Sequence, residues 1–323
     1  MSSTAQISRD QLSERVRTLR VPLVVAPMFL VSSPKLVVAA CKAGAIGSMP
    51  TLNAKTPEQL DDWLALVRDE LSWQHSAAWP VAPYALNVLM HQSNARLPHD
   101  LEAVRKHRPP IVIASVGRPD EVVDIVHEYG GLVLADVGSL KHAKRAADSG
   151  VDGLVLLCAG AGGQTGRLNP FAFVEATRRF FSGLIAVAGG ITHGRHLAAL
   201  QRLGADLGYS GTSFIATPES LATDDYKKAL LGSDIDDVWD TDAISGIPAN
   251  VLRATLTSLG LQPETRWVRT AQSNYDWSNI RWRPDLYSAG HGVGEVRAEE
   301  GCATIIGRFS EQYKASSLAG STS

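Results

Sequence analysis

Two pairs of residues in the second half of the chain have the composition of a phosphate-binding loop. Gly189-Gly190 and Gly211-Thr212 each follow a short apolar run. Glycine has no Cβ, so its backbone N–H groups can approach phosphate oxygens closely, and a short helix that begins there adds the positive end of its dipole. The glycines of these two pairs therefore predict a phosphate site. The alternative interpretation is that these glycines only form tight turns, which glycine also favours.

Other residues at the ends of apolar runs could position a substrate. Asn87 ends one run, Asp136 follows another, and residues 158–166 read Cys-Ala-Gly-Ala-Gly-Gly-Gln-Thr-Gly. These glycines do not fit a dinucleotide fingerprint, because the third one comes one position late and no helix begins until about residue 169. Cys158 could be a nucleophile, but a small buried residue is the simpler interpretation.

The apolar runs also predict the elements that must bring these residues together. Runs rich in Val, Ile and Leu alternate with helical patterns, as in βαβ units around a parallel sheet. Ser33-Pro34, Thr56-Pro57 and Asn169-Pro170 each place a polar cap before a proline, which is a helix start signal. The predicted strands are Pro22–Ala26, Ala45–Met49, Tyr84–Val88, Pro110–Ser115, Leu132–Ala135, Gly153–Leu157, Leu184–Ala188 and Asp206–Ser210.

Eight strands that are each followed by a helix predict an α/β fold, a (β/α)8 TIM barrel whose last unit closes near Pro218. A doubly wound sheet is the alternative, because a count of strands does not prove that the sheet closes. A barrel places its active site at the carboxyl ends of its strands. All the polar and glycine-rich residues above are found at such ends.

The chain is longer than one barrel. We expect the barrel over residues 20–218, a helical C-terminal extension over residues 219–313 that covers the barrel mouth, and a disordered tail over residues 314–323. Beyond Pro218 the sequence is acidic and lacks strand-like runs, and four of the seven Trp lie between Trp239 and Trp282. This aromatic extension suggests a homodimer.

Composition limits the partners. The 31 Lys and Arg against 33 Asp and Glu give a formal net charge of -2, without the basic excess of a nucleic-acid-binding protein. The Trp and Arg residues interleaved between positions 266 and 283 are therefore attributed to packing. No apolar run approaches the roughly 18 residues of a membrane span, and the polar N-terminus lacks the apolar core of a secretory signal. We expect a cytoplasmic protein with a small-molecule substrate and no membrane partner.

No metal site is expected. Cys41, Cys158 and Cys302 are too few and too scattered for a disulfide framework or a zinc site. His193 and His196 have helical spacing, but no carboxylate or thiol partner lies nearby in the sequence.

Several of these segments resemble one known family. Ala26-Pro27-Met28, Ala159–Gly166, Ala188–Ile191 and residues 211–220 resemble motifs of the flavin-dependent nitronate monooxygenases. The resemblance extends over about residues 20 to 310 and includes residues 246–250 and 288–294. It implies an FMN-binding (β/α)8 barrel with a helical second domain, which oxidises alkyl nitronates with O2 to carbonyl compounds and nitrite.

The resemblance also implies roles for individual residues. Met28 would contact the isoalloxazine ring, and Asn87 would form a hydrogen bond to the flavin. Asp136 is a departure, because the family often has a Lys in this neighbourhood, and it would change the charge near the flavin. The cofactor-binding residues implied are Ala26, Pro27, Met28, Asn87, Asp136, Gly162, Gly163, Gly189, Gly190, Gly211 and Thr212.

The clearest departure concerns catalysis. The family usually has a His where this chain has Gln164. Gln cannot take a proton near neutral pH, so general-base chemistry is lost there and neutral nitroalkanes should be poor substrates. A nitronate is already an anion, and Gln164 with Thr165 would orient it. His291 stands where the family commonly has Gln, and we expect it to reach the mouth and supply the missing imidazole.

Three functions remain open. The first is FMN-dependent oxidation of a nitronate or a related anionic carbon acid. The second is an FMN-dependent reductase that uses NAD(P)H to reduce an enoyl or similar acceptor. The third is a catalytically weak flavin-binding protein.

Overall fold

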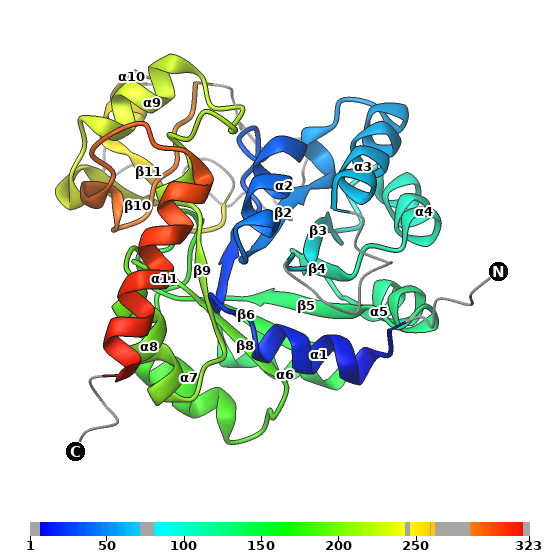
Figure 1. Ribbon diagram of the computed structural model, residues 1–323. Helices are drawn as coiled ribbons and strands as arrows, with labels where there is room; N and C mark the ends of the chain where they lie inside the picture. Colours follow the sequence, from blue (N-terminus) through cyan, green and yellow to red (C-terminus); the bar gives the residue numbers. More distant parts are fainter. Residues whose placement is uncertain (1–6, 72–80, 243–245, 259, 262–284, 319–323) are drawn as a thin grey trace.

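The computed structural model describes residues 7–71, 81–242, 246–258, 260–261 and 285–318. Eight parallel strands form a closed barrel in the order β1-β2-β3-β4-β5-β6-β8-β9 (Figure 1). The strands are β1 (Leu23–Val25), β2 (Ile46–Pro50), β3 (Tyr84–Leu89), β4 (Ile111–Ser115), β5 (Leu132–Val137), β6 (Gly153–Leu157), β8 (Leu184–Ala188) and β9 (Leu207–Ser210).

Closure of the sheet confirms the predicted TIM barrel over the doubly wound alternative. β1 pairs in parallel with β2 and also with β9, where Val24 lies opposite Tyr209. An open sheet would leave β1 or β9 with one neighbour only. The bounds of all eight strands agree with the predicted runs to within one or two residues at each end.

Helices cover the outside of the barrel. The three start signals are confirmed, because the side chains of Ser33, Thr56 and Asn169 accept hydrogen bonds from the N–H groups of the first helical turns. The helices that follow the strands are α2 (Pro34–Lys42), α3 (Pro57–Leu71), α4 (Leu97–His107), α5 (Asp120–Glu128), α6 (Leu140–Asp148), α7 (Pro170–Arg178) and α8 (Gly194–Leu203).

An additional helix closes one end of the barrel. In α1 (Arg9–Arg17), Leu12 and Val16 are buried in the same cluster as the inward-facing residues of the strands. Arg17 also forms an ion pair with Asp206, which directly precedes β9. Because α1 fills the end where the strands begin (Figure 1), any ligand must enter at the carboxyl ends of the strands.

The extension is not all helical, unlike the prediction. It contains α9 (Asp224–Leu231), α10 (Arg253–Ser258) and two strands, β10 (Val238–Thr241) and β11 (Ala249–Leu252). β11 pairs antiparallel with β10 and with β7 (Gly163–Gln164), which lies in the loop after β6. Both β10 and β11 have only four residues, which is too short for a clear periodic pattern. The partner of β11 in β7 lies about 85 residues earlier in the chain, so local sequence does not reveal this pairing.

The last helix lies on the flank of the barrel. α11 (Cys302–Leu318) packs against α8 and α2 rather than over the mouth (Figure 1). The predicted tail from residue 314 is therefore wrong as far as Leu318, because Tyr313 and Gln312 anchor this end of the helix to Gln201 and Gly194. Residues 319–323 lie outside the described residues.

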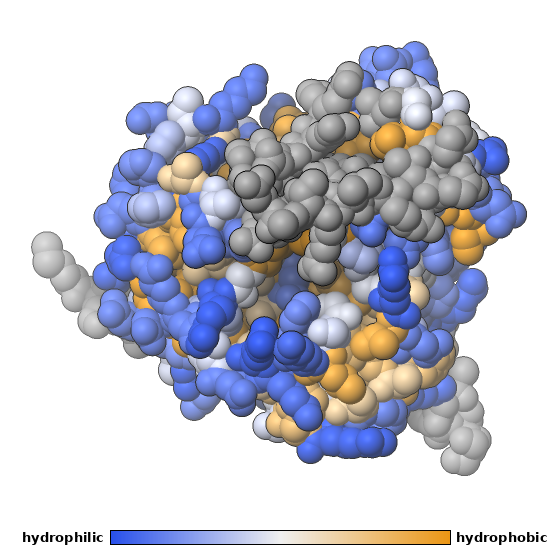
Figure 2. All heavy atoms as spheres, turned by 180° about the vertical axis from the view of Figure 1, so that it is seen from behind, coloured by the Kyte–Doolittle hydropathy of each residue, from blue (hydrophilic) through white to orange (hydrophobic). Residues whose placement is uncertain are grey.

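The described surface is mixed. Figure 2 shows the face that lies behind in Figure 1. Hydrophilic residues cover most of its described part, with smaller clusters of hydrophobic residues between them. Among the described helices, none is long and apolar enough to cross a membrane.

The contact between α8 and α11 gives a test of this packing. A Cβ on Gly194 would lie 2.1 Å from the carbonyl oxygen of Phe309, whereas a Cβ on Gly307 would meet nothing within 4 Å. We expect Gly194→Ala to lower the free energy of unfolding by about 1–3 kcal/mol through overpacking. Gly307→Ala should raise it by up to about 1 kcal/mol through helix propensity. Urea denaturation of both variants measures the difference, and equal effects would contradict the packing described here.

Candidate active site

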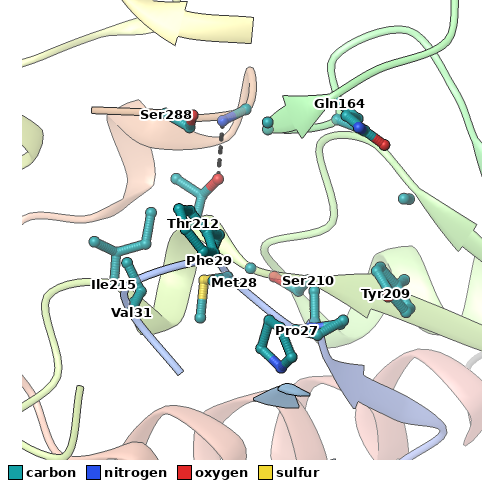
Figure 3. A pocket seen from close by; sticks show the side chains of 18 of the residues that line it. Pro27, Met28, Phe29, Val31, Gln164, Tyr209, Ser210, Thr212, Ile215 and Ser288 are labelled. Carbon is teal, nitrogen blue, oxygen red and sulfur yellow. Dashed lines mark hydrogen bonds between the residues drawn. The ribbon is translucent and has the colours of Figure 1, made fainter. Parts of the chain in front are cut away.

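The carboxyl ends of the barrel strands open into a cavity of about 420 Å³, a size typical of small-molecule sites. Figure 3 shows part of its lining, with residues from the segment after β1, from β9 and from the extension around one space. Most of the predicted site residues line it together. These are Ala26, Pro27, Met28, Asn87, Asp136, Gly162, Gly163, Gln164, Gly189, Gly190, Gly211 and Thr212.

One wall of the cavity is bare backbone. Gly189 and Gly190 follow β8 with φ angles of +127° and +68°, which residues with a side chain rarely adopt. A Cβ on Gly190 would meet nothing within 4 Å, whereas a Cβ on Gly189 would lie 2.8 Å from the carbonyl oxygen of Ala159. Among the described residues, none accepts a hydrogen bond from the N–H groups of Gly189, Gly190, Gly211 or Thr212. This wall can therefore donate several backbone hydrogen bonds to an anion.

The extension is fastened to this wall through Thr212. The Thr212 Oγ1 accepts a hydrogen bond of 2.9 Å from the N–H of Gly290, drawn as the dashed line in Figure 3. A Cβ on Gly290 would lie 2.6 Å from the carbonyl oxygen of Gly160. The loop around Gly290 thus approaches the loop after β6 at a distance that only glycine allows.

Gln164 is held at the cavity by the small sheet. Its partner in β11 is Ala249, and the neighbouring Asn250 donates 2.7 Å to the carbonyl oxygen of Ala161. Gln164 lines the cavity, and no described residue forms a hydrogen bond with its amide. The amide is therefore available to a ligand.

Thr165 is not brought into the cavity. Its side chain is buried, its hydroxyl lies 3.2 Å from the carbonyl oxygen of Cys158, and it accepts a hydrogen bond from Asn250. The geometry gives Thr165 a role in holding the loop rather than in contacting substrate.

His291 is also not a lining residue, although it packs against Gly160, which is one. Its side chain is exposed, and its Nδ1 packs against Gly160, where an added Cβ would come within 2.7 Å. His291 is anchored by a backbone hydrogen bond to the carbonyl oxygen of Gly160. This placement does not support the expectation that His291 supplies an imidazole to the site.

The floor of the cavity carries a polar chain of three side chains. The Asn87 amide donates to Ser115 Oγ over 2.6 Å, and the Ser115 hydroxyl donates to Asp136 Oδ2 over 2.5 Å. Asp136 Oδ1 is buried and has no partner among the described residues. Burial raises the pKa of Asp136 to about 6, although the hydrogen bond from Ser115 opposes this shift.

Several lining residues were not predicted. Ser115 ends an apolar run as Asn87 does, so its position at a strand end could have indicated it. Most of the other lining residues that were not predicted are apolar. They include Phe29, Leu52, Ile215, Leu221, Tyr226 and Leu286. Some of them come from the extension, which was predicted to cover the mouth, but the sequence did not indicate which of its residues reach the cavity.

Among the described residues, the remaining candidates from the sequence do not form a second site. Burial raises the pKa of the Cys158 thiol to about 12, which keeps it protonated and unreactive at neutral pH. His193 has no carboxylate nearby in the sequence, but the fold brings Glu295 to it, with 3.5 Å between His193 Nε2 and Glu295 Oε2. Among the described residues, no group of three metal-ligating side chains occurs. The tryptophans at 267, 277 and 282 lie outside the described residues.

Asp136 gives a prediction for the ligand-free protein. Its pKa is higher in the folded state, about 6, than in an unfolded chain, about 3.9. The folded carboxylate therefore costs stability, and this cost grows as pH rises from about 4 to 6 and stays constant above that. Asp136→Asn should raise the free energy of unfolding by about 1–3 kcal/mol at pH 8 and by much less at pH 4. Urea denaturation at both pH values measures this, and a gain that is independent of pH would contradict the assignment.

Comparison with known proteins agrees with this geometry. A family model described as nitronate monooxygenase matches residues 11–290. The nitronate monooxygenase of Paraburkholderia phytofirmans is 30% identical over 293 residues, which cover 79% of this chain and 80% of that protein. The structure of a nitroalkane oxidase from Streptomyces ansochromogenes matches with a TM-score of 0.77 at 21% identity, covering 94% of this chain and 99% of that one. FabK from Thermotoga maritima matches with a TM-score of 0.74 at 23% identity, covering 96% and 97%.

The two structural matches establish the fold only, because their sequence identities are low. The family match is evidence for function as well as fold, because it spans the barrel and reaches Gly290 in the loop over the mouth. The chain therefore belongs to the nitronate monooxygenase family and is a flavin-dependent oxidoreductase.

Proposed function

We propose that this protein binds FMN in the cavity at the barrel mouth and oxidises an alkyl nitronate, or a related anionic carbon acid, with O2. The observation that carries the proposal is the glycine-rich wall formed by Gly189, Gly190, Gly211 and Thr212, whose backbone N–H groups have no acceptor among the described residues. Such groups suit a phosphate without the help of a basic side chain.

The cavity fits a flavin in two further respects. An added Cβ on Gly190 would project into the open space where a phosphate would lie, which accounts for a glycine at this position. The floor offers Asn87 and Asp136 to the polar edge of a ring, while Met28 and Ile215 offer apolar contacts. When bound, the flavin supplies a ring that takes electrons from the substrate and passes them to O2.

The substrate would lie between the cofactor and the rim. The Gln164 amide can donate a hydrogen bond to an anionic oxygen of a nitronate, but it cannot remove a proton from a neutral nitroalkane. Apolar residues such as Phe29, Leu52 and Leu286 would contact the alkyl part. The site thus favours a carbon acid that arrives already deprotonated.

Gly190 tests the cofactor assignment. Gly190→Ala should weaken FMN binding by about ten- to a hundredfold, because the methyl group displaces the phosphate from the backbone donors. Gly260→Ala is the matched control, since Gly260 has a similar φ of +70° and equally open space but lies outside the cavity lining. Quenching of flavin fluorescence measures both affinities. Equal affinities in the two variants would place the phosphate elsewhere.

Gln164 tests the reaction. Under anaerobic conditions, ethyl nitronate should reduce the bound flavin and nitroethane should not. Gln164→Ala should slow reduction by ethyl nitronate by about tenfold or more through loss of a hydrogen bond to a charged group. Gln164→His should introduce some reduction by nitroethane, because His can act as a base.

The absorbance of the bound flavin decreases when the flavin is reduced, so it measures all of these reactions. The same absorbance measurement separates the competing functions. Reduction by NADH or NADPH with no response to nitronates would favour the reductase. A bound flavin that none of these compounds reduces would favour a catalytically weak flavin-binding protein. Either result would overturn the nitronate assignment.

A further inference from the structure

The hydrogen bonds on the cavity floor run in one direction. Asn87 Nδ2 donates to the carbonyl oxygen of Ile113 over 3.0 Å, which fixes the orientation of the amide because a carbonyl can only accept. The same nitrogen donates to Ser115 Oγ, so the Ser115 hydroxyl hydrogen is directed to Asp136 Oδ2. The donors of this chain are thereby used within the floor. What remains for a ligand is the Asn87 carbonyl oxygen and Asp136 Oδ1.

Among the described lining residues, no positively charged group offsets the charge of Asp136. The described residues that line the cavity include no Lys, Arg or His. The titratable group that faces Asp136 from β9 is Tyr209, and burial, with the nearby charge of Asp136, raises the pKa of this phenol well above its usual range. Tyr226, on α9 at the cavity, is also buried, which raises its pKa, so it too is neutral. The elements around the floor thus provide hydroxyl groups and no cation among the described residues.

A bound flavin would make the carboxylate of Asp136 less favourable still. The ring would replace the water that reaches the floor, and loss of water disfavours the charged form. The phosphate would add negative charge to the same cavity. A protonated carboxyl group avoids both costs and gains an O–H donor at Oδ1, the atom that has no partner in the ligand-free protein.

We propose that Asp136 binds the flavin as a neutral acid, so that cofactor binding takes up one proton from solvent onto Oδ1. This inference rests on the proposed flavin site, and it makes Asp136 a positioning residue whose O–H donates to the cofactor. The protein then binds the flavin with its highest affinity under mildly acidic conditions. Affinity decreases as pH rises above the pKa of the free protein, by up to tenfold per pH unit.

Calorimetry on FMN tests the proton uptake directly. Binding enthalpies at pH 7, measured in two buffers with different ionisation enthalpies, give the number of protons taken up. Protein with Asp136 should take up close to one proton more than Asp136→Asn. The phosphate of FMN titrates in both proteins, so the difference between them isolates the carboxyl group. Asp136→Asn keeps the shape of the side chain, can still accept from Ser115, and offers an N–H in place of the O–H.

Affinity against pH gives an independent measurement. Between pH 5 and 8, the affinity of native protein for riboflavin, which has no phosphate, should be nearly constant below about pH 6 and decrease progressively above it. Asp136→Asn should bind riboflavin equally at each pH. Ser115→Ala should move the onset of the decrease to higher pH, because the Ser115 hydrogen bond stabilises the carboxylate. Asp148→Asn, an exposed position on α6, should behave as the native protein does.

The outcomes separate this inference from the proposed function. Failure of FMN to bind any of the proteins would overturn the proposed function itself. FMN binding with equal proton uptake in native protein and Asp136→Asn would overturn the role of Asp136 alone. Affinity that increases with pH would also overturn it, because a carboxylate would then accept a hydrogen bond from the cofactor. If Asp136→Asn does not fold, the Ser115→Ala shift decides the question.

Discussion

Parallel pairing of β1 with β9 is the constraint on which the rest of the structure depends. It closes the sheet, so the carboxyl ends of eight strands meet around one opening. Residues that are far apart in the chain, such as Met28, Asn87, Asp136 and Gly190, thereby line one cavity. Helix α1 fills the opposite end with Leu12 and Val16. The barrel therefore has one open end, and the chemistry is confined to it.

The extension completes the site by close approach of backbone. Gly160 and Gly162 lie against Ala289 and Gly290, and the Thr212 hydroxyl accepts from the Gly290 N–H. The strand β11 pairs with Gly163 and Gln164 on the other side of the same loop. These contacts bring the loop after β6 and the extension together as one rim. Gln164 is consequently positioned by pairing of main chain, whereas Thr165 is used to hold the loop in place.

The described residues that line the cavity include no basic side chain. Backbone N–H groups at the glycine wall can compensate an anion, while the floor carries a buried carboxyl group in a chain of hydrogen bonds. This arrangement is consistent with a protein of nearly neutral net charge. Because burial raises the pKa of Asp136, the charge of the cavity floor depends on whether this carboxyl group is protonated.

The sequence by itself determined the barrel strands, the helix starts and the ring of residues at the strand ends, because these depend on local periodicity and on the geometry common to all such barrels. It also indicated the glycine wall and Gln164. Only the tertiary structure decided that Thr165 and His291 lie outside the cavity, that β10 and β11 form a sheet with β7, and that α11 packs on the flank. Side-chain direction in loops and pairing between distant segments depend on contacts that no local pattern encodes.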